Sequence, residues 1–325
     1  MNETIVIGID HGNSQIKTLN CVFPSGIIDH GVVDPGRDNI LEFNGHYYSA
    51  AMDHASLERD KTGSDRYYLL NLVAIAKELN ARGKFGGTYT INLAIGLPPG
   101  HMNKAFNEKN KAYYTKVNPV RFTMDHEDYT IFIEDIFLYP QGYGALAATK
   151  CDINKQKRFV IIDIGGGTVE YVTFINRQVD PSSCYSINMG AISIASEIIA
   201  QVSAQYGYDI IEDDVDDVML GRETLLPNEI KQVIVDIYRQ KALLFINKLR
   251  DLRKDPRVWH IFLTGGGAQY VKQFFTKENG VNSVFVEDDV RANAIGYEIM
   301  AKAALAKRAA LAGANAATAA AATMA

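Results

Sequence analysis

Paired cysteines and long apolar runs are both missing from this sequence. Its three cysteines, Cys21, Cys151 and Cys184, are far apart, which argues against a disulfide scaffold and against a cysteine zinc site. No apolar run approaches the roughly 20 residues that span a bilayer. The first residues lack the basic-then-apolar pattern of a signal peptide and any amphipathic anchor. We therefore expect a cytoplasmic protein with free thiols and no direct membrane contact.

Two familiar nucleotide-binding signatures are also absent. No G-x-x-x-x-G-K-[ST] segment occurs, and no glycine cluster has the G-x-G-x-x-G spacing of a dinucleotide fold. The formal net charge of -5 argues against a surface built wholly for nucleic acid. Contact with DNA through an adaptor protein stays open. The 325 residues exceed the roughly 250–300 that one core usually serves, so two domains are expected.

One local pattern occurs twice. An apolar strand ends at Asp10, a polar turn with Gly12 follows, and a second strand begins at Gln15. About 150 residues later, an apolar strand reaches Asp163, three glycines follow, and a strand begins at Val169. The repeat predicts two related domains that face each other. The charged stretch 151–158 marks their boundary, which gives domain I as residues 1–150 and domain II as residues 151–291.

The residue types in these turns suit a triphosphate with Mg²⁺. Glycine lets backbone N–H groups approach phosphate closely, and carboxylates hold the metal mostly through its waters. Asp10 and Asp163 supply the carboxylates, and Lys17 supplies a cation on the same strand face as Gln15. Each turn alone could be an ordinary β-turn, but two copies in matched strand contexts favour a phosphate clamp. A third glycine cluster, residues 265–267, follows another strand.

The order of motifs resembles the actin, DnaK-type chaperone and sugar-kinase superfamily. It is similar to phosphate 1 (10–17), connect 1 (139–145), phosphate 2 (163–168), adenosine (264–267) and connect 2 (293–296). Within the superfamily, the chain most resembles the ParM-type plasmid-segregation actins and their archaeal relatives. The Asp-x-Gly-Asn-Ser-x-x-Lys form of phosphate 1, the Gly-Leu-Pro-Pro turn at residues 96–99 and the Tyr-Pro-Gln-Gly-Tyr-Gly connect 1 support this.

The resemblance implies the fold. We expect an α/β, two-domain actin-like ATPase fold, in which each domain is a duplicated mixed five-stranded sheet with helices, related to RNase H. A C-terminal helix, residues 292–310, would return to domain I. Residues 311–325 form an alanine-rich tail to which we assign no function.

The resemblance also implies roles for individual residues. Asp10 and Asp163 would hold Mg²⁺ and, with Gln141, form the catalytic set. Gln141 would orient the attacking water, because an amide cannot accept its proton at neutral pH; the alternative is a helix-capping residue. The residues expected to bind the nucleotide are Gly12, Asn13, Ser14, Lys17, Gly165, Gly166, Gly167, Thr168, Gly265, Gly266 and Gly267.

The implied function is a filament-forming ATP (or GTP) hydrolase that segregates plasmid DNA through a centromere-binding adaptor. Subunits would stack head to tail, which gives open helical filaments. A small-molecule kinase of the same superfamily is the enzymatic alternative. It would need a further catalytic carboxylate beside a phosphate motif, and the sequence offers only Asp10 and Asp163. A cytoskeletal actin unrelated to plasmids is the other alternative.

Two charged segments lie outside these motifs. The acidic run 212–217 is typical of a solvated loop, since it lacks the spacing of a metal site. Basic side chains recur between residues 239 and 254, where a helix is predicted. They favour an ordinary helix surface, with a filament contact as the alternative.

Overall fold

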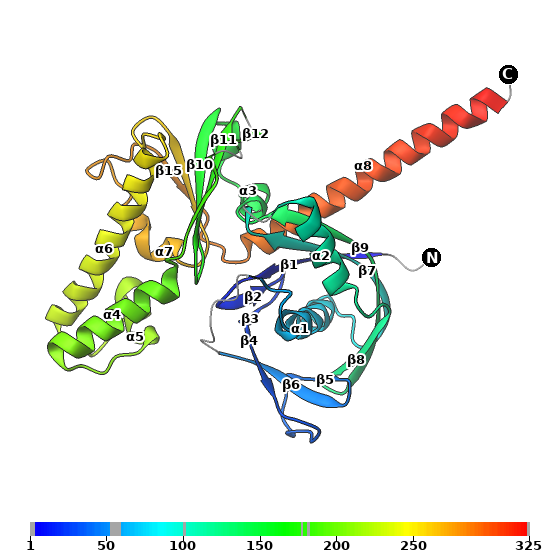
Figure 1. Cartoon of the computed structure of the whole chain (residues 1–325), viewed down its shortest axis with the longest axis horizontal. Helices are drawn as coiled ribbons and strands as arrows, with labels where there is room; N and C mark the ends of the chain where they lie inside the picture. Colours follow the sequence, from blue (N-terminus) through cyan, green and yellow to red (C-terminus); the bar gives the residue numbers. More distant parts are fainter. Residues whose placement is uncertain (1–3, 53–59, 100–101, 177, 181–182, 324–325) are drawn as a thin grey trace.

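The computed structural model describes the chain except residues 1–3, 53–59, 100–101, 177, 181–182 and 324–325 (Figure 1). Two sheets organise it, and we call the surrounding parts domain I and domain II. Among the described residues, the domain I sheet has nine strands in the order β3-β2-β1-β7-β9-β8-β5-β6-β4. Their bounds are β1 Ile5–His11, β2 Gln15–Lys17, β3 Val22–Pro24, β4 Gly26–Asp29, β5 Ile40–Phe43, β6 His46–Ala51, β7 Gly87–Leu97, β8 Val120–Met124 and β9 Glu127–Pro140.

The domain II sheet repeats part of this order. Its path is β12-β11-β10-β14-β15, and β13 also pairs with β11. The bounds are β10 Arg158–Ile164, β11 Val169–Ile175, β12 Gln178–Val179, β13 Tyr185–Ile187, β14 His260–Thr264 and β15 Val284–Val286. In both sheets an antiparallel meander of three strands leads into parallel strands.

The predicted two-domain α/β architecture is confirmed, but the strand count differs from five in each domain. Five strands, β3-β2-β1-β7-β9, match the path of domain II. In domain I, β9 is 14 residues long and extends beyond this unit. Its residues 127–131 pair with β8, and β5, β6 and β4 continue the sheet. The larger count therefore comes from an arm added to the repeated unit.

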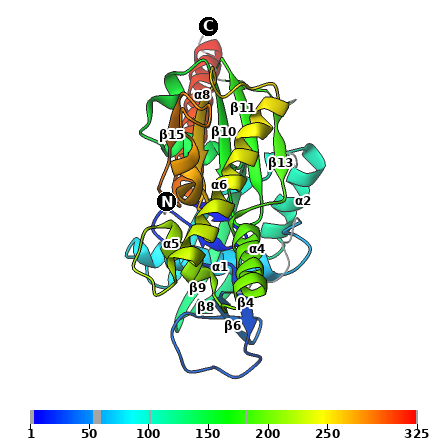
Figure 2. The same ribbon diagram turned by 90° about the vertical axis from the view of Figure 1, so that its left-hand side faces the viewer.

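Helices cover both sheets. Their bounds are α1 Arg66–Ala81, α2 Lys104–Tyr114, α3 Tyr143–Ala148, α4 Ala191–Tyr206, α5 Glu212–Met219, α6 Asn228–Asp251, α7 Ala268–Val271 and α8 Ala292–Thr323. Helix α7 is short, since it passes into a 3₁₀ turn at Lys272–Phe274. Figure 2 shows α4 and α6 along one face of domain II. Within the described residues, no helix is both long and apolar enough to cross a membrane.

Helix α1 is the centre of the domain I core. Nearly all its side chains from Tyr67 to Leu79 are buried, because the strands of the added arm curve around it (Figure 1). A helix that is apolar all round is stable only in such an enclosure. The core of domain II forms separately, between its sheet and helices α4 and α6.

Helix α8 returns from domain II to domain I. Tyr297 and Ala301 pack with Val6 and Ala94 of the domain I sheet, and the carboxylate of Glu298 accepts a hydrogen bond from the Gly8 N–H at 3.4 Å. Beyond this contact α8 projects away from the body (Figure 1). The alanine-rich tail continues it as a helix to Thr323, and residues 324–325 lie outside the description.

Candidate functional site

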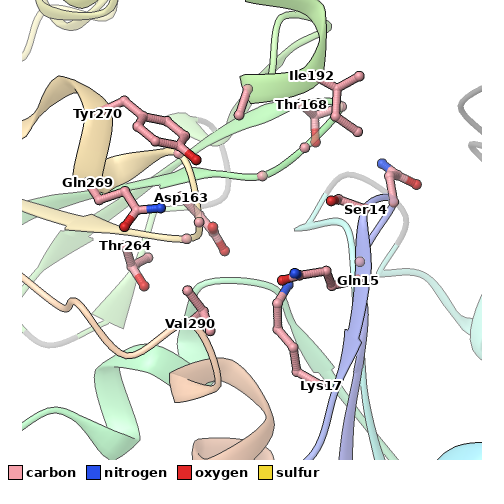
Figure 3. A pocket seen from close by; sticks show the side chains of 18 of the residues that line it. Ser14, Gln15, Lys17, Asp163, Thr168, Ile192, Thr264, Gln269, Tyr270 and Val290 are labelled. Atoms are coloured by element: carbon pink, nitrogen blue, oxygen red, sulfur yellow. The ribbon is translucent and has the colours of Figure 1, made fainter. Parts of the chain in front are cut away.

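A cleft of about 1080 Å³ brings together the turns that follow β1, β10 and β14. Figure 3 shows Ser14 and Lys17 on one side, facing Asp163 and Thr168 on the other. The predicted site residues that line it are Asp10, Gly12, Asn13, Ser14, Lys17, Gln141, Asp163, Gly165, Gly166, Thr168, Gly265, Gly266 and Gly267. Gly167, also predicted, is not among the residues that line the cleft. Its carbonyl accepts a hydrogen bond from the Gly190 N–H at 3.1 Å.

The strand registers explain why the charged groups meet. Asp10 on β1 lies opposite Lys17 on β2, and Lys17 Nζ is 3.6 Å from Asp10 Oδ2. Gln15, two residues before Lys17, also lines the cleft, so the expected shared face is present. Asp163 occupies the corresponding place in domain II, between Glu170 on β11 and Thr264 on β14.

Asn293 holds Asp163 in place. Its Nδ2 donates to Asp163 Oδ2 at 3.0 Å, and its Oδ1 accepts from the N–H groups of Gly142 and Ala145, each at 3.1 Å. One amide thus joins the start of α8, the start of α3 and the carboxylate. The sequence placed Asn293 in connect 2 but gave no sign of this bridging role.

Burial raises the pKa of Asp163 to about 6, and the nearby Asp10 charge adds to the rise while the Asn293 hydrogen bond opposes it. The charged carboxylate is therefore costly without a cation beside it. A divalent metal would remove that cost. Two carboxylates and a lysine ammonium around one cleft are a donor set that fits a polyphosphate with Mg²⁺.

Glycines let the loops of the two domains approach each other. A Cβ on Gly166 would lie 3.0 Å from Ile192 Cδ1 and 3.1 Å from Ser14 Cβ, across the cleft. Gly265 has a φ of +87°, and a Cβ there would lie 2.5 Å from the Ile164 carbonyl oxygen. A side chain at Gly166 would push against Ser14 and Ile192, and one at Gly265 would clash with the Ile164 backbone.

Gln141 lies at the end of β9, with its backbone N–H donating to the Leu97 carbonyl at 2.8 Å. Helix α3 begins after it, with Gly142 as N-cap and without a side-chain cap hydrogen bond. Gln141 is therefore not the residue that caps α3. The side chain of Gln141 lines the cleft instead.

The acidic run 212–217 is not a solvated loop, so that prediction is wrong. It is the first part of helix α5, whose Val215 and Met219 are buried against domain II. Glu212, Asp213 and Asp216 line the cleft, and burial raises the pKa of Asp216. The apolar pair at i, i+4 within the acidic run is the signal that could have identified this helix.

His11 lies at the end of β1, and no role was predicted for it. The side chain is 1% exposed, and its ring stacks on Tyr114 with centroids 5.4 Å apart. Neither ring nitrogen has a hydrogen-bond partner in the described part of the chain. Burial, together with the charge of Lys61, lowers the pKa of His11 to about 3.

Replacing His11 with phenylalanine should make the protein more resistant to acid. An unfolded histidine gains its proton as pH falls below about 6.5, whereas folded His11 stays neutral down to about pH 3. Stability is therefore lost over this window, by about 2 kcal/mol at pH 5. Between pH 7.5 and 5.0, the free energy of unfolding of His11→Phe, measured in urea, should fall by about 2 kcal/mol less than that of the wild type. His126→Asn, in an exposed turn, is the control that should behave like the wild type, and an unchanged His11→Phe profile would contradict the argument.

Comparisons with known proteins agree with this geometry. A family model described as actin like proteins N terminal domain matches residues 8–144. A second, described as archaeal actin homologue MreB-like, C-terminal, matches residues 161–277. No curated protein matches the chain. The two matched segments fall one on each domain.

Solved structures share the fold at low identity. The archaeal actin homologue Ta0583 is 19% identical, with a TM-score of 0.69 over 93% of this chain and 100% of its own. ParM in a 15-stranded filament from Clostridium botulinum is 20% identical, with a TM-score of 0.68 over 92% and 99%. Bacillus thuringiensis ParM with ATP is 12% identical, with a TM-score of 0.66 over 91% and 98%. With both domains matched by actin-family models and a shared fold over nearly the whole chain, the protein belongs to the actin-like superfamily.

Proposed function

We propose that this protein is a nucleotide hydrolase that polymerises head to tail with ATP and Mg²⁺ and disassembles after hydrolysis. The observation that carries the proposal is one cleft lined by Asp10 and Lys17 from domain I and by Asp163 and Gly265 from domain II. A ligand held by both domains favours their closed arrangement. Hydrolysis then weakens that preference and, with it, the contacts between subunits.

The residues of the cleft divide the work of hydrolysis. Lys17 and Asn13, which line the cleft, would bind the terminal phosphates, and the Tyr67 hydroxyl donates to Asn13 Oδ1 at 3.3 Å, which orients that amide. Asp10 and Asp163 would hold Mg²⁺, which neutralises phosphate charge when bound. Gln141 orients the attacking water without taking its proton.

ATP is the proposed nucleotide. Bacillus thuringiensis ParM is described with ATP, and the archaeal homologue Ta0583 in complex with ADP. The base end of the cleft contains Asp216, Gln269 and Tyr270, polar groups that could read either purine. GTP is therefore the competing substrate in the experiment below.

Sedimentation after adding ATP-Mg²⁺, GTP-Mg²⁺ or ADP-Mg²⁺ tests the proposal. ATP should drive the wild type into the pellet, and ADP should not. Gln141→Ala should still assemble, but its phosphate release should fall by about 100-fold because the water is no longer positioned. Gln141→Glu keeps an oxygen that can orient water and should retain most activity. A protein that stays in the supernatant while phosphorylating an added hydroxyl compound would instead be a kinase.

We further propose that the filament moves plasmid DNA through a separate centromere-binding adaptor. Support comes from the likeness to ParM structures, including a filament, and from the acidic net charge. Plasmid retention should require the protein together with its neighbouring genes. Normal retention in its absence, with a change in cell shape, would favour a cytoskeletal actin.

A further inference from the structure

The phenol of Tyr297 is enclosed where helix α8 crosses the domain I sheet. Its side chain is fully buried, and its hydroxyl has no hydrogen-bond partner within the described residue ranges. Buried polar groups are almost always hydrogen-bonded, because an unpaired one keeps the full cost of losing water. The groups around this hydroxyl therefore point to its partner.

Tyr297 lies one helical turn after Asn293 on α8. Side chains four residues apart share a helix face and point back toward the start of the helix. Asn293 already donates to Asp163 at 3.0 Å. The Tyr297 side chain follows it toward the same end of α8, which is the end beside the cleft.

Gly96 on β7 makes room for the phenol. A Cβ on Gly96 would lie 2.2 Å from the Tyr297 hydroxyl oxygen, so a larger residue at this position would displace the hydroxyl. On the neighbouring strand β9, Tyr139 is paired with Gly96, and its ring stacks on that of Tyr297 with centroids 6.1 Å apart. The phenol is thus held from the β9 side by an aromatic ring.

Asp10 lies on the other side of Gly96. On the parallel strand β1, Gly8 is opposite Ala94 of β7, and continuing this register by two residues places Asp10 beside Gly96. A Cβ on Gly8 would lie 2.1 Å from a carbonyl oxygen of α8. Because side chains alternate along a strand, Asp10 points to the same α8 face as Gly8. The Asp10 carboxylate and the Tyr297 hydroxyl are therefore neighbours on one face of the sheet.

The phenol is a donor in this setting. Burial raises the pKa of Tyr297 well above its usual value, and the charges of Asp10 and Asp163 raise it further. The hydroxyl thus keeps its proton beside the carboxylates. Asp163 already accepts a hydrogen bond from Asn293. For Asp10 the structure shows an ion pair with Lys17 at 3.6 Å, which is longer than a hydrogen bond.

We propose that Tyr297 positions Asp10 by donating a hydrogen bond to its carboxylate, directly or across one bridging water molecule. The inference rests on the proposed function, in which Asp10 holds Mg²⁺. Helix α8 then orients both carboxylates of the cleft, Asp163 through Asn293 and Asp10 through Tyr297. A carboxylate fixed by such a partner loses less freedom when it holds a cation.

A double-mutant cycle on the protein without nucleotide or metal tests the hydrogen bond itself. Tyr297→Phe keeps the buried ring and removes the hydroxyl. In the wild-type background it should raise the equilibrium constant for unfolding about fivefold, because a hydrogen bond to a charged group is lost. In an Asp10→Ala background the carboxylate is already gone, so the same change should leave that constant unchanged or lower it. The difference between the two backgrounds measures the coupling of the two side chains.

Tyr68→Phe is the matched control for this cycle. Tyr68 on α1 is equally buried, and its hydroxyl also has no partner in the described part of the chain. Burial raises the pKa of Tyr68 to about 12, and the charge of Asp65, not that of Asp10, adds to the rise. Tyr68→Phe should therefore have the same effect with and without Asp10. An equal effect of Tyr297→Phe in both backgrounds would overturn the inference, whether or not the protein binds a nucleotide.

Calorimetric titration with ADP tests the consequence for the cation. Mg²⁺ should tighten ADP binding to the wild type, and Tyr297→Phe should reduce this enhancement about tenfold, which corresponds to about 1.4 kcal/mol. ADP binding in EDTA should not change. An undiminished enhancement in Tyr297→Phe would overturn the positioning role and leave the proposed function intact. A wild type that binds ADP equally well with and without Mg²⁺ would overturn the proposed cation site, while the mutant cycle still decides the hydrogen bond.

Discussion

Replacing Gly296 with alanine should lower the free energy of unfolding by about 3 kcal/mol or more, since overpacking against backbone cannot be relieved by side-chain rotation. A Cβ on Gly296 would lie 2.6 Å from the Cα of Gly144 and closer still to its carbonyl group. The contact is reciprocal, because a Cβ on Gly144 would lie 2.7 Å from the Cα of Asn293. Helices α3 and α8 therefore cross backbone to backbone, and an added methyl forces them apart.

The same displacement should reach the cleft. Asn293 lies one turn before Gly296 and holds Asp163 at 3.0 Å, so moving α8 loosens the carboxylate and weakens nucleotide binding. Urea unfolding and nucleotide titration measure the two effects. Gly313→Ala is the matched control on the same helix, because nothing lies within 4 Å of its added methyl. It should be neutral or stabilising by up to about 1 kcal/mol. Wild-type stability for Gly296→Ala would contradict the close crossing.

The sequence predicted well those elements whose signals are local. Strands β2 and β11 begin at Gln15 and Val169, as predicted. In each, apolar periodicity and flanking turn residues agree. The carboxylates at the ends of β1 and β10 and the glycines that follow these strands are equally local. That is why the cleft could be foreseen from two short segments about 150 residues apart.

The features that the sequence did not reveal depend on contacts between distant segments. Asn293 bridges to Asp163 only because α3 and α8 cross. His11 reads as part of a polar turn, yet Tyr67 and Tyr114 from two helices enclose it. Helix α2 escaped prediction because its sequence is polar, although Asn103 caps it by accepting from the Phe106 N–H. Each of these features depends on tertiary packing, which the periodicity of apolar residues along the sequence does not reveal.

Replacing Asp163 with asparagine should stabilise the metal-free protein and abolish its activity. The folded pKa of Asp163 is about 6, against 3.8 for the free group. Between these values the folded carboxyl keeps a proton that the unfolded one has lost. The stabilising effect of that proton is complete below pH 3.8 and is lost as pH rises through 6. At pH 7.5 the ionised side chain therefore lowers the free energy of unfolding by about 3 kcal/mol. A neutral amide at this position has no such effect.

Unfolding at several pH values isolates this effect. The free energy of unfolding of Asp163→Asn should exceed that of the wild type by up to about 3 kcal/mol at pH 7.5. The difference should shrink toward pH 4. The new amide oxygen can still accept from Asn293, so the bridge between α3 and α8 survives. Asp38→Asn, at an exposed position, should show no such pH-dependent gain.

The same variant should release phosphate from ATP-Mg²⁺ at least about 100-fold more slowly, because a charge that stabilises the reacting centre is gone. A variant that is less stable than the wild type at pH 7.5, or that hydrolyses ATP at the normal rate, would contradict this role for Asp163. The expected gain in stability and the expected loss of hydrolysis both come from removing one buried negative charge. Burial makes the ionised carboxylate of Asp163 unfavourable when no cation is bound, and a bound cation offsets that cost.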